Sequence, residues 1–100
     1  MIIKKKDWGT PLIIEIKDEK GNVEDISGAT IKKMIFKKPD GARVSKVAEF
    51  YTDGTDGKIQ YKLSAGLINI SGLWKYEGFV ETPEGAWSTT MLEFTVDEIL

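Results

Sequence analysis

The sequence contains no cysteine and no histidine. The absence of cysteine excludes a disulfide framework, a thiolate nucleophile, and zinc or iron–sulfur sites with cysteine ligands. The absence of histidine removes the usual general base near neutral pH and the commonest metal ligand, so Ser-His-Asp and Cys-His chemistry are excluded. An enzyme would depend on carboxylate pairs, lysine or tyrosine in a concave site, which a thin domain of this length rarely provides. We therefore expect no enzymatic activity, no catalytic residue, no metal site and no cofactor.

Long apolar runs are also missing. No window of the sequence approaches the ~20 apolar residues of a membrane span, so we expect no such span. The first six residues place their apolar side chains before three lysines, whereas a signal peptide begins with its basic segment. We therefore expect a soluble protein that is made in the cytoplasm.

A strong charge of either sign is absent as well. The formal net charge is −2, but residues 1–50 carry 11 Lys and Arg against 8 Asp and Glu, and residues 51–100 carry 3 against 8. The two halves therefore have charges of +3 and −5. This asymmetry could orient stacking with a partner, yet it falls far below the concentrated basic footprint that nucleic-acid binding requires. We expect no nucleic-acid partner.

The length of 100 residues is close to the commonest domain size, which predicts a single domain over residues 1–100. Apolar residues recur with period two in short runs that turn residues close, which is typical of strands rather than helices. About seven strands are predicted, over residues 2–6, 11–17, 30–38, 43–51, 58–63, 73–81 and 87–96. We interpret residues 64–71 as a helical turn or a crossover between two sheets. The spacing predicts an all-β, immunoglobulin-like β-sandwich of antiparallel strands with Greek-key connections.

The predicted strand over residues 30–38 breaks strict alternation. Ile31 differs in parity from Met34 and Phe36. A β-bulge at Lys32 and Lys33 would bring these three apolar residues onto one face. We therefore expect a bulge there, with flanking lysines that discourage pairing with the edge of another chain.

The last two predicted strands form a hairpin with a five-residue loop over residues 82–86. A register with Val80 opposite Ser88 makes apolar residues face apolar ones and opposite charges face each other. The resulting pairs are Trp74 with Phe94 and Tyr76 with Leu92 on the inner side, and Lys75 with Glu93 on the outer side. We expect the four inner residues of these pairs to fill the middle of the sandwich.

The outer side of this hairpin contains a candidate interface. The same register places Phe79 opposite Thr89, with Trp87 and Met91 diagonal to it. Ile35 joins them if the predicted third strand pairs beside the hairpin, as in an immunoglobulin sandwich. A cluster of exposed aromatic and apolar side chains often marks an interface. The candidate interface residues are Ile35, Phe79, Trp87 and Met91, with chance exposure, cover by a loop or another register as the alternatives.

Two other groups of residues have simpler explanations. Asp40, Asp53 and Asp56 could suggest a calcium site, but their spacing fits no EF-hand, and Asp-Gly pairs are common in turns. Glutamates of the final hairpin could suggest a glycosidase pair, but the predicted register turns Glu77 and Glu81 to solvent. We expect turn chemistry in the first group and a solvated face in the second.

The start of the predicted strand over residues 73–81 has a recognisable spacing. Gly72, Trp74 and Tyr76 follow the pattern of an immunoglobulin F strand, in which a large aromatic residue anchors a corner through a hydrogen bond. Tryptophan donates only through its indole N–H, so Trp74 would have to form that bond differently from a tyrosine.

The order of several short motifs resembles a known family. These motifs are Thr10-Pro11-Leu12, Asp18-Glu19-Lys20-Gly21, Ile26-Ser27-Gly28-Ala29-Thr30, Lys38-Pro39-Asp40-Gly41, Asp53-Gly54-Thr55-Asp56-Gly57 with Ile59 and Tyr61, Gly72 with Trp74 and Tyr76, and Phe94-Thr95-Val96. Over nearly the whole chain, their order and spacing resemble the amino-terminal domain of phage baseplate upper proteins. The stretch from Gly28 to Pro39 is one residue longer than the family pattern. That domain usually opens a longer protein, so a chain ending at Leu100 would be either a trimmed piece or a small virion protein.

The resemblance implies a non-catalytic structural or assembly domain of a phage or prophage tail or baseplate, which docks to other virion proteins. It also implies a location in the virion after synthesis in the bacterial host cytoplasm, with copies forming a homo-oligomer that follows the symmetry of the tail. A fold alone does not fix a function. The alternative hypothesis is a carbohydrate-binding or adhesion module, in which Trp87 or Phe79 stacks on a sugar ring of a host-surface glycan.

Overall fold

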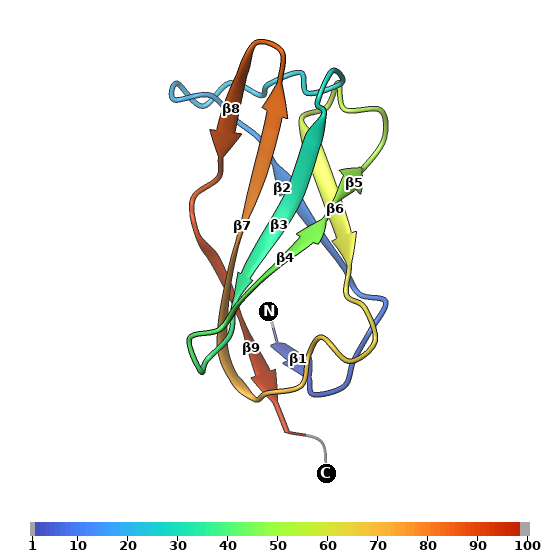
Figure 1. Ribbon diagram of the computed structural model, residues 1–100, viewed down its shortest axis with the longest axis vertical. Coiled ribbons are helices and arrows are strands. Elements are labelled where there is room, and N and C mark those ends of the chain that lie inside the picture. Colours follow the sequence, from blue (N-terminus) through green and yellow to red (C-terminus); the bar gives the residue numbers. More distant parts are fainter. Residues whose placement is uncertain (1, 99–100) are drawn as a thin grey trace.

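The computed structural model describes residues 2–98, which form two β-sheets and contain no helix (Figure 1). Accordingly, these residues include no helix that is long and apolar enough to cross a membrane. The strands of the described residues are β1 (Ile2–Lys4), β2 (Pro11–Glu15), β3 (Ile31–Lys37), β4 (Arg43–Val47), β5 (Glu49–Phe50), β6 (Lys58–Lys62), β7 (Gly72–Thr82), β8 (Gly85–Ser88) and β9 (Leu92–Asp97). Each predicted strand is present, and two of them are divided, the fourth into β4 and β5 and the last into β8 and β9.

The larger sheet has the strand order β1-β9-β7-β3-β4, with β8 also paired to β7, and the smaller sheet has the order β2-β6-β5. The chain changes sheet four times, between β1 and β2, β2 and β3, β4 and β5, and β6 and β7. The predicted all-β sandwich is confirmed, and the strand order fits the immunoglobulin-like arrangement. Residues 63–71 form the predicted crossover from turns, without a helix. The prediction of antiparallel strands is wrong for β1, which pairs parallel to β9 at the far end of the chain.

The core consists of the residues that each sheet turns inward. In β7 these include Trp74, Tyr76 and Val80, and Phe94 of β9 faces Trp74 as predicted. The ring centres of Trp74 and Phe94 lie 5.8 Å apart, and burial raises the pKa of the Tyr76 phenol. Leu92 faces Tyr76 as predicted but is 39% exposed, so the prediction that it fills the core is wrong. Leu92 lies at the start of β9, beyond the part of the strand, residues 95–97, that pairs with β1.

β3 runs without a bulge. It pairs with β7 in one unbroken register along its whole length, so the predicted bulge is wrong. Ile31 therefore lies on the outer face, where it is 41% exposed. Lys32 has the inward parity at this end of the strand, and its Nζ lies 4.3 Å from the centre of the Phe50 ring. The alkyl stem of a lysine covers apolar surface while its ammonium group reaches solvent, so Lys32 occupies the position that the prediction gave to Ile31.

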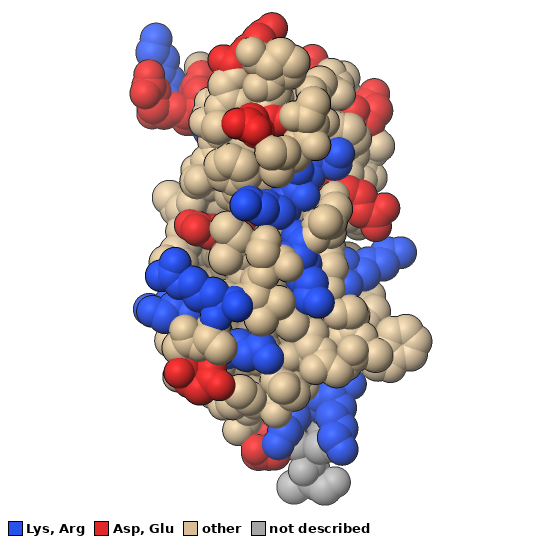
Figure 2. All heavy atoms as spheres, in the orientation of Figure 1, with Lys and Arg blue, Asp and Glu red and all other residues tan. Residues whose placement is uncertain are grey.

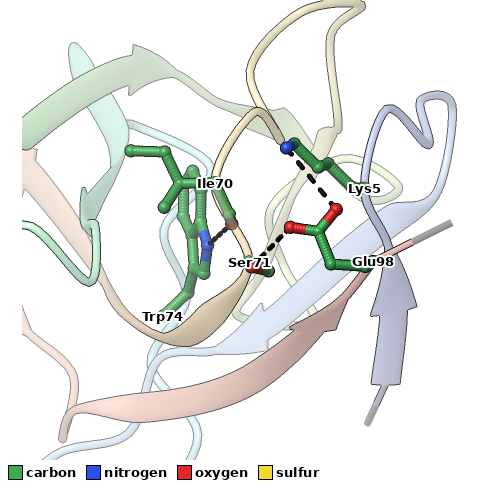
Figure 3. A network of polar contacts seen from close by, with 5 residues as sticks. All are labelled: Lys5, Ile70, Ser71, Trp74 and Glu98. Atoms are coloured by element: carbon green, nitrogen blue, oxygen red, sulfur yellow. Dashed lines mark hydrogen bonds and ion pairs between the residues drawn. The ribbon is translucent and has the colours of Figure 1, made fainter.

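Trp74 also fixes the crossover that leads into β7 (Figure 3). Its indole Nε1 donates a hydrogen bond of 2.9 Å to the carbonyl oxygen of Ile70, which takes the place of a tyrosine corner. Nearby, the Ser71 hydroxyl donates to Glu98 Oε1 at 2.9 Å, and Lys5 Nζ lies 3.6 Å from Glu98 Oε2. These contacts connect the crossover to the residues that follow β1 and β9, although an exposed ion pair contributes only about 0–1 kcal/mol.

The final hairpin has a shorter loop than predicted. Thr82 pairs with Gly85, which leaves residues 83 and 84 as the loop in place of the predicted five residues. Val80 therefore faces Trp87 instead of Ser88, and the predicted register is wrong in this half of the hairpin. In the other half, between residues 73–76 and 92–95, the predicted register is confirmed.

A β-bulge joins the two halves of the hairpin. Residues 77–78 of β7 stand opposite residues 89–91, so the second strand has one extra residue. The Thr89 amide donates to the Gly78 carbonyl at 3.0 Å, and Thr89 Oγ1 accepts a hydrogen bond of 2.9 Å from the Gly78 amide. The threonine side chain thus pairs a backbone donor that the interrupted ladder would leave unsatisfied.

Candidate functional site

The structure separates Trp87 from the other three predicted interface residues. Because Trp87 faces Val80, its side chain lies on the inner side of the larger sheet, half-buried against the core. Gly85 precedes it by two residues on the same face, and a Cβ atom at Gly85 would come within 3.3 Å of the Trp87 ring. The prediction of an outward Trp87 is therefore wrong, because the two-residue loop shifts β8 by one position relative to β7.

Ile35, Phe79 and Met91 lie on the outer face of the larger sheet, which is turned away from the smaller sheet. Ile35 faces Glu77 of β7, and Phe79 lies one row further along, opposite Lys33. The Lys33 Nζ is 5.1 Å from the centre of the Phe79 ring. Ile35 and Met91 line one shallow depression of about 50 Å³, and Met91 is 58% exposed. The structure therefore brings Ile35 and Met91 together and places Phe79 diagonally beside Ile35.

A row of basic residues crosses the same face. Arg43 of β4 faces Lys37 of β3, and Lys37 faces Lys75 of β7. Lys75 in turn faces Glu93 of β9, as predicted. The three cations also line the depression beside Ile35. Figure 2 shows Lys and Arg side chains gathered over the middle and lower part of the molecule, while acidic side chains are prominent at its upper end.

We refer to Ile35, Phe79, Met91 and the row of Arg43, Lys37 and Lys75 together as the apolar–basic face. The sequence predicted the apolar members of this face but not the row of cations. The row exists only because β3 lies between β4 and β7, and the order of these strands does not follow from the sequence pattern. The alternation of Lys33, Ile35 and Lys37 is the signal that could have found it.

Asp40, Asp53 and Asp56, the alternative calcium ligands, accept hydrogen bonds from residues of the turns in which they lie. Asp53 Oδ1 accepts hydrogen bonds from the hydroxyl and the amide of Thr55, at 2.6 and 3.0 Å, and these bonds hold the pKa of Asp53 below its ordinary value. Asp56 and Asp40 each accept a bond from the backbone amide two residues further on, at 3.0 and 2.9 Å. Among residues 2–98, no group of three or more potential metal-ligating side chains is placed to hold an ion.

Comparison with models of protein families gives a match over residues 5–100 to the family described as the BppU N-terminal domain. The matched region includes β2 to β9 and every residue of the apolar–basic face. A comparison with curated proteins found no match.

Proposed function

Because the chain belongs to the family of baseplate upper protein N-terminal domains, we propose that it is a non-catalytic assembly domain of a phage tail or baseplate, held in the virion by contacts with other virion proteins. The apolar–basic face is the observation that supports this proposal. It lies on the side of the larger sheet that the smaller sheet does not cover (Figure 1). The proposal assigns no catalytic residue and no cofactor to the chain.

The arrangement of charge on this face favours an acidic partner surface. Lys37 has a cation directly opposite on both sides, Arg43 in β4 and Lys75 in β7. Like charges that face each other across strands destabilise a sheet, so a carboxylate-bearing partner would relieve this repulsion on docking. Ile35 and Met91 would supply apolar contact beside the cations, as in an interface with an apolar core and a polar rim.

We further propose that several copies of the chain dock together, related by the symmetry of the tail. Repeated weak contacts then add up, because once one copy of an assembly is bound, the others bind at a high effective concentration. A single domain of this size therefore does not require high affinity for its partner.

Incorporation into tails tests the assembly proposal. The full chain is co-expressed with the tail proteins of its own phage, and its copies per purified tail are counted by quantitative mass spectrometry. We expect Lys37→Glu/Lys75→Glu to lower incorporation roughly tenfold or more, because like charges across an interface cost several kcal/mol. The matched control, Lys17→Glu/Lys20→Glu, makes the same change in charge away from this face and should leave incorporation unchanged. Equal incorporation of both folded variants would contradict the proposal.

A further inference from the structure

A second surface feature lies away from the apolar–basic face, between β8 and the segment that follows β2. It is a groove of about 920 Å³, which falls within the range of roughly 300–1,000 Å³ that is usual for ligand sites. One wall comes from Glu15, Lys17, Asp18, Glu19, Lys20, Gly21 and Glu24, and the other from Ala86, Trp87, Ser88, Thr89 and Thr90. The groove therefore joins two segments that are more than 60 positions apart in the sequence.

Trp87 supplies an aromatic surface to this groove. Its ring lies against Gly85, whose missing Cβ atom leaves the necessary room, since an added Cβ would lie 3.3 Å from Cη2 and 3.4 Å from Cζ2. The ring is half-buried against the core and also forms part of the groove lining. The hairpin register gives the indole this position, because Trp87 faces Val80 and so lies on the side of the sheet that borders the groove. Packing against Gly85 and the core holds the ring in place at the border of the groove, and a fixed aromatic ring is a suitable platform for a flat apolar ligand surface.

The remaining lining is rich in hydrogen-bonding groups. Thr90, which carries a hydroxyl, belongs to the same wall as Trp87, and Glu19 and Glu24 belong to the opposite wall. Asp18 holds this wall in shape, because its Oδ1 accepts hydrogen bonds from the amides of Lys20 and Asn22 at 2.8 and 2.9 Å. With four carboxylates and two lysines, the lining has an excess of negative charge, which disfavours an anionic ligand.

We propose that this groove binds a neutral oligosaccharide of β-linked pyranoses, with one sugar ring stacked on Trp87 and its hydroxyls bonded to the carboxylates and hydroxyls of the two walls. A pyranose with equatorial substituents has a flat face of C–H groups and an edge of hydroxyls, which matches an aromatic platform between acceptors. An extended peptide added to the free edge of β8 fits less well. Such a peptide needs pockets for its alternate side chains, and Ala86 and Ser88 of β8 are small and exposed.

Calorimetric titration of the full chain with chitohexaose and with cellohexaose tests the proposal. We expect saturable binding of at least one of these sugars, weakened at least tenfold in Trp87→Ala. Glu19→Gln, which alters only an exposed side chain, should weaken binding severalfold and serves if Trp87→Ala does not fold. The matched control is Trp8→Ala, because Trp8 is 70% exposed in the loop between β1 and β2 and does not line the groove.

Three results would overturn the proposal: no saturable binding of either sugar, undiminished binding by folded Trp87→Ala and Glu19→Gln, or equally tight binding of the anionic polygalacturonate. Saturable binding of an extended peptide that protects the same groove, with no sugar binding, would assign the groove to a protein partner instead. The outcome is independent of tail assembly, because the groove and the apolar–basic face share no residue.

Discussion

At the scale of single residues, Trp74 connects the core to the crossover between the sheets. It is completely buried, stacks on Phe94, and donates its indole N–H to the Ile70 carbonyl. Phenylalanine would keep part of the stacking and lose the donor. A tyrosine would place its donor at the end of the ring, at a different distance from the backbone. The corner at this position therefore depends on the indole.

We expect Trp74→Phe to lower the free energy of unfolding by about 2–4 kcal/mol. The loss combines the cavity left by the smaller ring with the unmade hydrogen bond of the half-buried Ile70 carbonyl. Urea denaturation followed by far-UV circular dichroism measures this change. Trp8→Phe is the control, because Trp8 is largely exposed and surface substitutions usually change stability by less than about 0.5 kcal/mol. Similar losses in the two variants would contradict the role given to the Trp74 corner.

At the scale of strands, the alternation of apolar and polar residues predicted most of the strands. It failed where a particular side chain, Thr89 or Lys32, decides the local pairing or burial. Trp74, Tyr76 and Phe94 were correctly predicted as inward residues, because period-two burial depends only on local sequence. The hairpin bulge was missed because it depends on a bond between Thr89 and Gly78, which alternation does not encode. The bulge expected in β3 is absent because Lys32, and not Ile31, has the inward position. A lysine stem can fill an inward position, so a break in apolar alternation does not require an extra residue.

Alternation of apolar and polar residues also predicted the candidate surfaces only in part. Phe79 was found from the parity of the hairpin, and Ile35 from its parity together with the expected pairing of the third strand beside the hairpin; both lie on the outer face. Trp87 was assigned to the wrong face, because an error of one residue in the register of β8 against β7 reverses the face of every residue in β8. The groove beside Trp87 could not be predicted, since its walls meet only after the larger and smaller sheets have packed together.

The bulge makes a prediction at this scale. Thr89→Val keeps the shape of the side chain but removes the oxygen that accepts the hydrogen bond from the Gly78 amide. We expect a loss of about 1–3 kcal/mol in the free energy of unfolding, the usual cost of leaving a buried donor unpaired. Thr90→Val is the matched control, because Thr90 is exposed and the same exchange should change stability by less than about 0.5 kcal/mol. Equal stability of the two variants in urea titrations would show that Thr89 does not hold the bulge.

At the scale of the whole molecule, the two ends differ in how their loops are held. One end contains aspartates whose oxygens accept hydrogen bonds from nearby backbone amides: Asp18 from Asn22, Asp25 from Ser27, and Asp53 from Thr55. Gly54 and Gly57 bring these loops close together, since Ile26 donates to the Gly54 carbonyl and Ile16 to the Gly57 carbonyl. The Trp74 corner belongs to the other end, with the crossover of residues 63–71 and the residues that follow β1 and β9.

As the pH falls, the loops that contain Asp18, Asp25 and Asp53 should therefore be destabilised before the Trp74 corner. Hydrogen bonds hold the pKa of each of the three aspartates below the ordinary value of 3.8, chiefly from the Asn22 amide for Asp18, the Ser27 amide for Asp25 and the Thr55 hydroxyl for Asp53. A lowered pKa in the folded state means that the stabilisation is present above the ordinary value and is lost as the pH falls through the lowered values. The hydrogen bond from the Trp74 indole to the Ile70 carbonyl involves no group that titrates in this range.

Amide NMR spectra recorded from pH 6 down to pH 2 measure this difference. We expect the Asn22, Ser27 and Thr55 amide signals to shift and lose protection from exchange at a higher pH than the Trp74 indole signal. Asp18→Asn retains a side-chain oxygen that accepts the bond but does not titrate, so it should remove the acid-dependent change at Asn22 and leave those at Ser27 and Thr55. Loss of all four signals at one common pH, unaltered in Asp18→Asn, would mean that the sandwich unfolds as a unit and that these turns do not set its acid limit.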